Sequence, residues 1–127
     1  MVVIIKCHGL AICFPGDMEV AGWKGLLKDK TFVQAISEVN VFVASHHGRE
    51  NGCCEELFSQ TGLKPQVVLI SDSGVEHATQ QTVSWYGARA GGMNYKGQTR
   101  RVFTTRSDGR ILIEASPSGT TLDIGVS

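Results

Sequence analysis

Carboxylate and imidazole side chains follow apolar segments of this chain at three places. Loops at the ends of buried strands are held by a rigid scaffold, and functional residues are common in them. Carboxylate oxygen and imidazole nitrogen are together the donors that suit Zn²⁺ or a similar divalent ion. If the three strands are neighbours in a sheet, their loops meet at one edge, where we predict a site. Asp17, His46 and His47 are its catalytic and metal-binding candidates, and His77 is a further metal-binding candidate.

Each of these residues also has an ordinary structural explanation. Asp17 follows a glycine and precedes a predicted helix, which is the position of a turn residue or a helix N-cap. Adjacent histidines such as His46 and His47 are often one buried, hydrogen-bonded ring and one solvated ring. The residue types by themselves leave both explanations open.

The four cysteines form no CxxC pair, so the sequence predicts neither a thiolate zinc site nor a thioredoxin-type motif. Cys53 and Cys54 lie close in sequence to His46 and His47, an arrangement that a thiol nucleophile could use. A catalytic thiol also needs a lowered pKa, which nothing in the sequence indicates. Reduced thiols in a helix turn are therefore the favoured interpretation.

Short apolar runs separated by turn residues indicate the elements that position these loops. The runs 2–5 and 10–14 flank His8-Gly9, which predicts a tight hairpin. Apolar residues recur at spacings of three and four over 19–28, which predicts an amphipathic helix. We expect further helices over 32–36, 55–58 and 80–90, and further strands over 39–45, 67–71, 101–105, 110–114 and 120–124.

The order of these elements favours one α/β (α+β) domain over residues 1–127. Strands alternate with helices in the middle of the chain, and Asp108-Gly109 predicts a hairpin between 101–105 and 110–114. A terminal antiparallel meander after such an alternation indicates a mixed sheet with helices packed on it. We find no internal linker and no fixed-period repeat in the sequence.

Composition excludes several classes of protein. The chain has 127 residues, of which 42% are hydrophobic and 19% charged, so it can bury a core and is unlike a disordered tail. Twelve basic and twelve acidic residues balance, so no net field attracts nucleic acid or membrane. No apolar run approaches the roughly 20 residues of a membrane helix. We therefore expect a soluble, cytoplasmic protein with no membrane partner.

Basic residues gather toward the end of the chain. Residues 89–127 hold six Lys or Arg and three acids, whereas 1–88 hold six bases and nine acids. The basic stretch 89–110 beside a metal site would suit phosphate-containing substrates or nucleic acid. A solvated strand face is the alternative that we favour. Within this stretch, 92–99 has part of the spacing of a phosphate-binding loop, but Gln98 stands where Lys is required.

Two motifs in order make the sequence resemble a known family. Phe14-Pro15-Gly16-Asp17, a Trp-containing helix and then the strand ending in Ser45-His46-His47-Gly48 resemble the C-terminal half of the metallo-β-lactamase fold. The type that it resembles most is the hydrolase domain of ComEC-like competence proteins. The segments 67–71 and 104–111 continue the resemblance, which covers nearly the whole chain.

The resemblance implies half of an αββα sandwich, a mixed sheet with helices on one face and a metal site at one edge. Asp17 would bridge two metal ions, and His46 or His47 would act as a ligand or a proton-transfer group. His77 would match a later histidine of the family, although Ala78 replaces the proline that often follows it there. The complete enzyme would hydrolyse a phosphodiester or related ester with metal-activated water.

One family motif is missing from this chain. The first metal-ligand motif, His-x-His-x-Asp-His, does not occur in it. A two-metal centre needs ligands from both halves of the fold, so we expect weak zinc binding at best and no complete catalytic site. Half a sandwich exposes an apolar sheet face, which predicts a homo-oligomer or pairing with a missing N-terminal half. The alternative function is a non-catalytic, self-associating or partner-binding module that retains the half-sandwich.

Overall fold

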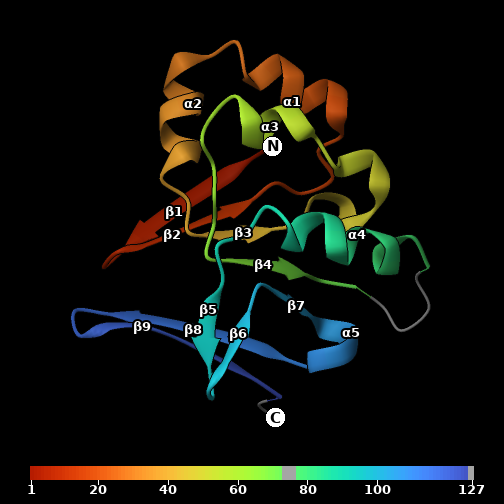
Figure 1. The fold of residues 1–127 in the computed structure, drawn as a ribbon. Helices are drawn as coiled ribbons and strands as arrows, with labels where there is room; N and C mark the ends of the chain where they lie inside the picture. Colours follow the sequence, from red (N-terminus) through yellow and green to blue (C-terminus); the bar gives the residue numbers. More distant parts are fainter. Residues whose placement is uncertain (73–76, 126–127) are drawn as a thin grey trace.

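A five-stranded mixed sheet forms the centre of the protein (Figure 1). This computed structural model describes residues 1–72 and 77–125, and for 77–81 it describes the backbone alone. The strands, in spatial order, are β1 (Val3–Cys7), β2 (Leu10–Phe14), β3 (Val41–Val43), β4 (Val67–Ile70) and β7 (Val102–Thr104). β1 is antiparallel to β2, whereas β2, β3, β4 and β7 run parallel to one another. The carboxyl ends of these four strands therefore lie at one edge.

The hairpin of β1 and β2 forms as the sequence predicts. Cys7 pairs with Leu10 across the two-residue turn. His8 and Gly9 both have positive φ, 48° and 85°, as the favoured two-residue hairpin turn requires. β1 forms one edge of the five-stranded sheet.

Helices cover one face of this sheet (Figure 1). They are α1 (Val20–Leu26), α2 (Lys30–Ser37), α3 (Glu55–Ser59) and α4 (His77–Gly87). Asp29 caps α2, because its side chain accepts hydrogen bonds from the backbone N–H groups of Thr31 and Phe32. Trp23, Phe42 and Tyr86 are almost completely buried between these helices and the sheet. None of the described helices combines the length and apolar character needed to cross a bilayer.

Two hairpins lie against the opposite face of the sheet (Figure 1). One pairs β5 (Met93–Tyr95) with β6 (Gln98–Arg100), and the other pairs β8 (Ile111–Ser116) with β9 (Gly119–Ile124). Successive side chains of a strand point to opposite faces. Val67 and Leu69 therefore pack with Leu122 on the hairpin side, whereas Val68 and Ile70 pack under the helices.

This architecture confirms the α+β class and the mixed sheet. β3 and β4 are covered on both faces, which explains why nearly every residue of the predicted strands 39–45 and 67–71 is apolar. The more specific prediction, half of an αββα sandwich, stays a prediction.

The predicted hairpin between 101–105 and 110–114 is wrong. β7 pairs in parallel with β4, and β8 pairs with β9 instead. Thr104 begins a short helix, α5 (Thr105–Asp108), because its hydroxyl oxygen accepts the N–H of Ser107. Gly109, with φ of 78°, ends that helix. The positive φ of glycine suits a helix end as well as a hairpin turn, so Asp-Gly did not specify the hairpin.

The stretch 92–99 forms a hairpin, which the sequence analysis did not predict. Lys96 and Gly97 both have positive φ, 50° and 85°, and connect β5 to β6. The side-chain oxygen of Asn94 accepts the N–H of Gly97 at 3.0 Å and stabilises the turn. The glycines that suggested part of a phosphate-binding loop therefore have a turn-forming role.

Truncation of Trp23 tests the core between helices and sheet. The indole is fully buried, with ring centroids 6.2 Å from Phe32 and 6.1 Å from Phe42. We expect Trp23→Ala to lower the free energy of unfolding by about 3–5 kcal/mol, measured by urea denaturation followed by circular dichroism. Phe14→Ala is the control, because that residue is 42% exposed and loss of its ring should lower the unfolding free energy by under about 1.5 kcal/mol. Equal losses in the two variants would contradict this packing.

Candidate functional site

The carboxyl ends of the four parallel strands gather the polar loops of the protein. In open sheets with parallel strands, ligands bind outside the carboxyl ends of the strands. The loops after β2, β3 and β4 belong to neighbouring strands, so they meet at this edge as the sequence predicts. The loop after β7 lies beyond that of β4. The residues that we consider at this edge are Asp17, His46, His47, Ser71, Asp72, Thr105 and Arg106.

Hydrogen bonds join the loop after β2 to the loop after β3. The backbone N–H of His46 donates to the carbonyl of Gly16 at 2.8 Å. The hydroxyl of Ser45, which is fully buried, donates to the carbonyl of Met18. These contacts hold the residues on both sides of Asp17, whose side chain is exposed. The structure therefore brings the Asp17 loop and the histidine pair together.

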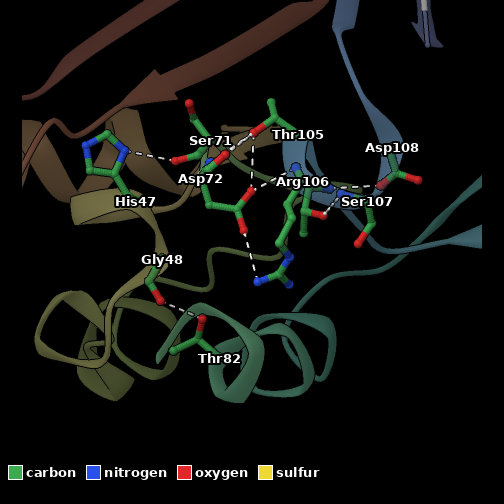
Figure 2. Close-up of polar contacts among 10 residues, drawn as sticks. His47, Gly48, Ser71, Asp72, Thr82, Thr105, Arg106, Ser107 and Asp108 are labelled. Carbon is green, nitrogen blue, oxygen red and sulfur yellow. Dashed lines mark hydrogen bonds and ion pairs between the residues drawn. The ribbon is translucent and has the colours of Figure 1, made fainter. Parts of the chain in front are cut away.

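A left-handed turn presents the two histidines at the end of β3. His46, His47 and Gly48 have φ of 51°, 55° and 78° in succession. Histidine adopts this conformation more often than most residues, yet it still costs about 1–3 kcal/mol per residue. The hydroxyl of Thr82 on α4 donates to the carbonyl of Gly48 and supports the turn (Figure 2). Backbone strain of this kind is common at functional sites.

The ring of His47 is oriented by the backbone that follows β4. Nδ1 of His47 lies 2.8 Å from the carbonyl oxygen of Ser71 (Figure 2). Since a carbonyl oxygen only accepts, Nδ1 must carry the hydrogen. In the neutral form of the imidazole, a hydrogen on Nδ1 leaves the lone pair on Nε2. Metal-binding histidines commonly have this arrangement, in which the other ring nitrogen donates to a carbonyl or carboxylate.

The ring of His46 is held differently. Its Nδ1 lies 3.0 Å from the side-chain oxygen of Asn51, and its Nε2 lies 3.4 Å from Nη1 of Arg49. Because a guanidinium only donates, Nε2 of His46 accepts. The amide of Asn51 in turn donates to Glu19 at 3.4 Å. Both ring nitrogens of His46 thus contact protein side chains, whereas Nδ1 of His47 contacts a backbone carbonyl, a difference in partners that the sequence did not reveal.

The side chain of His77 lies outside the described residues. The residue begins α4, the helix after the β4 loop. Within the described part of the chain, no group of three or more His, Cys, Asp or Glu side chains could hold a metal ion. Asp17 and His47 offer an oxygen and a nitrogen donor of the right chemistry for zinc, but a structural or catalytic zinc site has at least three protein ligands. These described donors alone therefore do not fit a complete metal centre.

A buried carboxylate that the sequence did not single out follows Ser71, whose carbonyl contacts His47. The side chain of Asp72 has no exposed surface. Its Oδ1 accepts the backbone N–H of Arg106 at 3.0 Å and lies 3.2 Å from the hydroxyl of Thr105. Its Oδ2 is 3.6 Å from Nη1 of Arg106 (Figure 2). The available signal was its position directly after a buried strand, the same signal that identified Asp17 and His46.

Three arginines of the basic stretch 89–110 form ion pairs within the protein. Arg89 pairs with Glu55, Arg100 with Asp108 and Arg106 with Asp72. Arg100 also lies over the ring of Phe103, at 4.2 Å from its centroid. Nucleic-acid binding by this stretch stays a prediction.

Comparison with known proteins adds no relative. No family model matches the sequence, and no curated protein or solved structure is significantly similar to it. The resemblance to the metallo-β-lactamase fold therefore rests on the motifs of the sequence.

The thiols of this region do not have the properties of an activated nucleophile. Burial raises the pKa of Cys54, and it also raises the pKa of Cys53. Neither shift favours the reactive thiolate form. The structure thus favours the interpretation of Cys53 and Cys54 as packing residues.

Alkylation tests this conclusion about the thiols. Cys7 is exposed, whereas burial raises the pKa of Cys13 to about 12. With iodoacetamide at pH 8, we expect Cys13 to react at least about a hundred-fold more slowly than Cys7, because the thiolate is the nucleophile. Peptide mass spectrometry of the native protein gives the order of modification. Faster labelling of Cys53 or Cys54 than of Cys7 would restore the nucleophile hypothesis.

Proposed function

We propose that this chain is the C-terminal portion of a metallo-β-lactamase-fold, metal-dependent hydrolase. In the complete enzyme, the substrate is a phosphodiester or a related ester. The observation that supports this proposal best is the junction of three loops at the carboxyl edge. The Asp17 loop is hydrogen-bonded to His46, and the ring of His47 is hydrogen-bonded to the carbonyl that follows β4. The two motifs on which the resemblance rests thus lie close together in the fold, as a shared metal site would require.

Within this proposal, the two histidines have different roles. His47 is the imidazole donor, because the carbonyl of Ser71 directs its lone pair to Nε2. His46 anchors the loop through Asn51 and Arg49. Asp17 is the carboxylate donor, and its exposed side chain belongs to a loop that Ser45 holds in place.

The metal, zinc or another divalent ion, supplies an activated water when it is bound in the complete enzyme. Asp17 and His47 are fewer donors than a zinc site needs, and in this proposal His77 or a segment beyond this chain supplies the further ligands. We therefore propose that the chain alone is catalytically incomplete. This fits the absence of a His-x-His-x-Asp-His motif from its sequence.

Zinc titration followed by amide NMR tests the proposed half-site. We expect Zn²⁺ to shift the signals of 16–18 and 45–48 in the wild-type chain. His47→Asn should weaken this response at least about tenfold, and His46→Asn by less than about threefold. Asparagine suits both positions, since it tolerates positive φ and its amide replaces the Nδ1–H donor while removing Nε2. Equal losses in the two variants, or no response in the wild type, would contradict the proposal.

One observation favours a second candidate, a self-associating or partner-binding module. An apolar groove of about 410 Å³ lies on the hairpin side of the sheet. Its lining includes Ile5 and Phe14 of the β1–β2 hairpin and Ile113 of β8. Val3, Ile5 and Phe14 are 41%, 48% and 42% exposed. Exposed apolar surface of this kind marks an interaction site, and β1 also presents an open sheet edge.

The mass of the particle in solution shows whether a second copy of the chain covers this groove. A second copy on the groove would give a particle of twice 13.7 kDa, which Ile5→Lys should convert to a monomer. A monomer that binds an apolar-surface dye, and stops binding it in Ile5→Lys, would instead indicate that another segment covers the groove. A monomer without dye binding would reject the second candidate. Light scattering coupled to chromatography provides the mass.

A further inference from the structure

We infer that Thr105 is a positioning residue that orients the ring of His47 through the single peptide group between Ser71 and Asp72. The inference rests on the proposed function only for the role of the His47 ring, which is to bind a metal ion. The hydrogen-bonded path itself consists of described residues. It connects a hydroxyl at the end of β7 to an imidazole at the end of β3, across the intervening strand β4 (Figure 2).

The two ends of one peptide group carry this path. The Ser71 carbonyl oxygen is 2.8 Å from Nδ1 of His47. The N–H of Asp72, which belongs to the same peptide group, donates to Oγ1 of Thr105 at 2.9 Å. A trans peptide group is planar and rigid, and its C=O and N–H point in opposite directions. A rotation of the group about its neighbouring bonds therefore changes both hydrogen bonds together.

The carboxylate of Asp72 fixes the hydroxyl that holds this peptide group. Oγ1 of Thr105 lies 2.9 Å from the carbonyl oxygen of Asp72 and 3.2 Å from its Oδ1, so its hydrogen has acceptors on Asp72. The same Oδ1 accepts the backbone N–H of Arg106 at 3.0 Å. Thr105 thus donates to Asp72 and accepts from it. This two-way contact leaves the hydroxyl little freedom to turn away from the N–H of Asp72.

Pairing of the strands does not account for these contacts. The ladder between β4 and β7 ends with Ile70 opposite Thr104, so Asp72 lies two residues and Thr105 one residue beyond it. Asp72 is also an expensive residue to bury, since a charged group without exposed surface loses its hydration. Its Oδ2 has no hydrogen-bond partner in the described part of the chain and is compensated by the Arg106 guanidinium, whose Nη1 lies 3.6 Å away. The contact of Asp72 with Thr105 also fixes the peptide group that faces His47, which is the role that we infer for it.

The tautomer of His47 is the direct readout of this inference. In protein with ¹⁵N-labelled imidazole rings, we expect the wild-type His47 to show a protonated Nδ1, with its signals assigned by their loss in His47→Asn. Thr105→Val keeps the shape of the side chain but removes the hydroxyl. We expect this variant to lose most of the Nδ1–H signal of His47. Thr105→Ser restores the hydroxyl and should restore the wild-type spectrum.

His46 and a distant threonine serve as controls. His46 is next to His47, but its ring is held by Asn51 and Arg49 rather than by the Ser71 carbonyl, so its signals should not change. Thr31→Val, at an exposed position on α2, is the matched substitution and should leave both rings unchanged. If Thr105→Val does not fold, Thr105→Ala provides the same loss of the hydroxyl. An unchanged His47 tautomer in the folded variant, or equal changes in His46 and His47, would overturn the inference.

Zinc binding separates this inference from the proposed function. If both are right, Thr105→Val should weaken the zinc response of the loops about 10-fold or more, and Thr105→Ser should restore it. A wild-type chain without any zinc response contradicts the proposed metal half-site. In that case, loss of the Nδ1–H signal in Thr105→Val still supports the positioning role of Thr105.

Discussion

Parallel pairing of β2, β3, β4 and β7 is the constraint on which the rest of the structure depends. Parallel strands place all of their carboxyl ends at the same edge, so the loops that follow them meet there. Asp108-Gly109 suggested a hairpin of β7 with β8, an arrangement that does not require β7 to pair with β4. Without that pairing, Thr105 and Arg106 would not have been placed beside Asp72. The chemistry at this edge is thus a consequence of sheet order as much as of residue type.

Polar groups at this edge are satisfied mainly by one another. Ser45 and Thr82 are almost completely buried, and each donates its hydroxyl hydrogen to a carbonyl of a loop at the edge. Buried polar groups without partners are costly, so these contacts stabilise one loop conformation over its alternatives. They also offset the strain of the left-handed turn at His46 and His47. In the resulting arrangement, the two adjacent imidazoles contact different partners.

The two faces of the sheet differ in how completely they are covered. On one face, helices enclose Trp23 and Phe42, whereas on the other the hairpins leave a groove next to the β1–β2 hairpin. Val3, Ile5 and Phe14 lie at that open end. Exposed apolar surface at this end can contact a further segment or a partner. Both proposed functions involve contact with another segment or chain. The hydrolase proposal places a metal half-site at the carboxyl edge, whereas the binding-module proposal needs no metal there.

The sequence by itself determined the α+β class, the β1–β2 hairpin and the loops in which chemistry is concentrated. Local signals specify these features, such as the apolar strands 39–45 and 67–71 and the polar residues directly after them. Asp17, His46 and His47 could be selected in this way, because their residue types and positions are visible without a fold.

Only the tertiary structure decided which strands pair and what each polar side chain contacts. The turn at Asp108-Gly109 was misjudged because a glycine with positive φ ends a helix as readily as it forms a hairpin. His46 and His47 are adjacent residues of one type, and the fold gives their rings different partners, Asn51 for one and the Ser71 carbonyl for the other. Asp72 became a candidate only when β7 was found beside β4. Hydrogen bonds between residues far apart in sequence depend on the packing of the whole chain, and local patterns do not encode them.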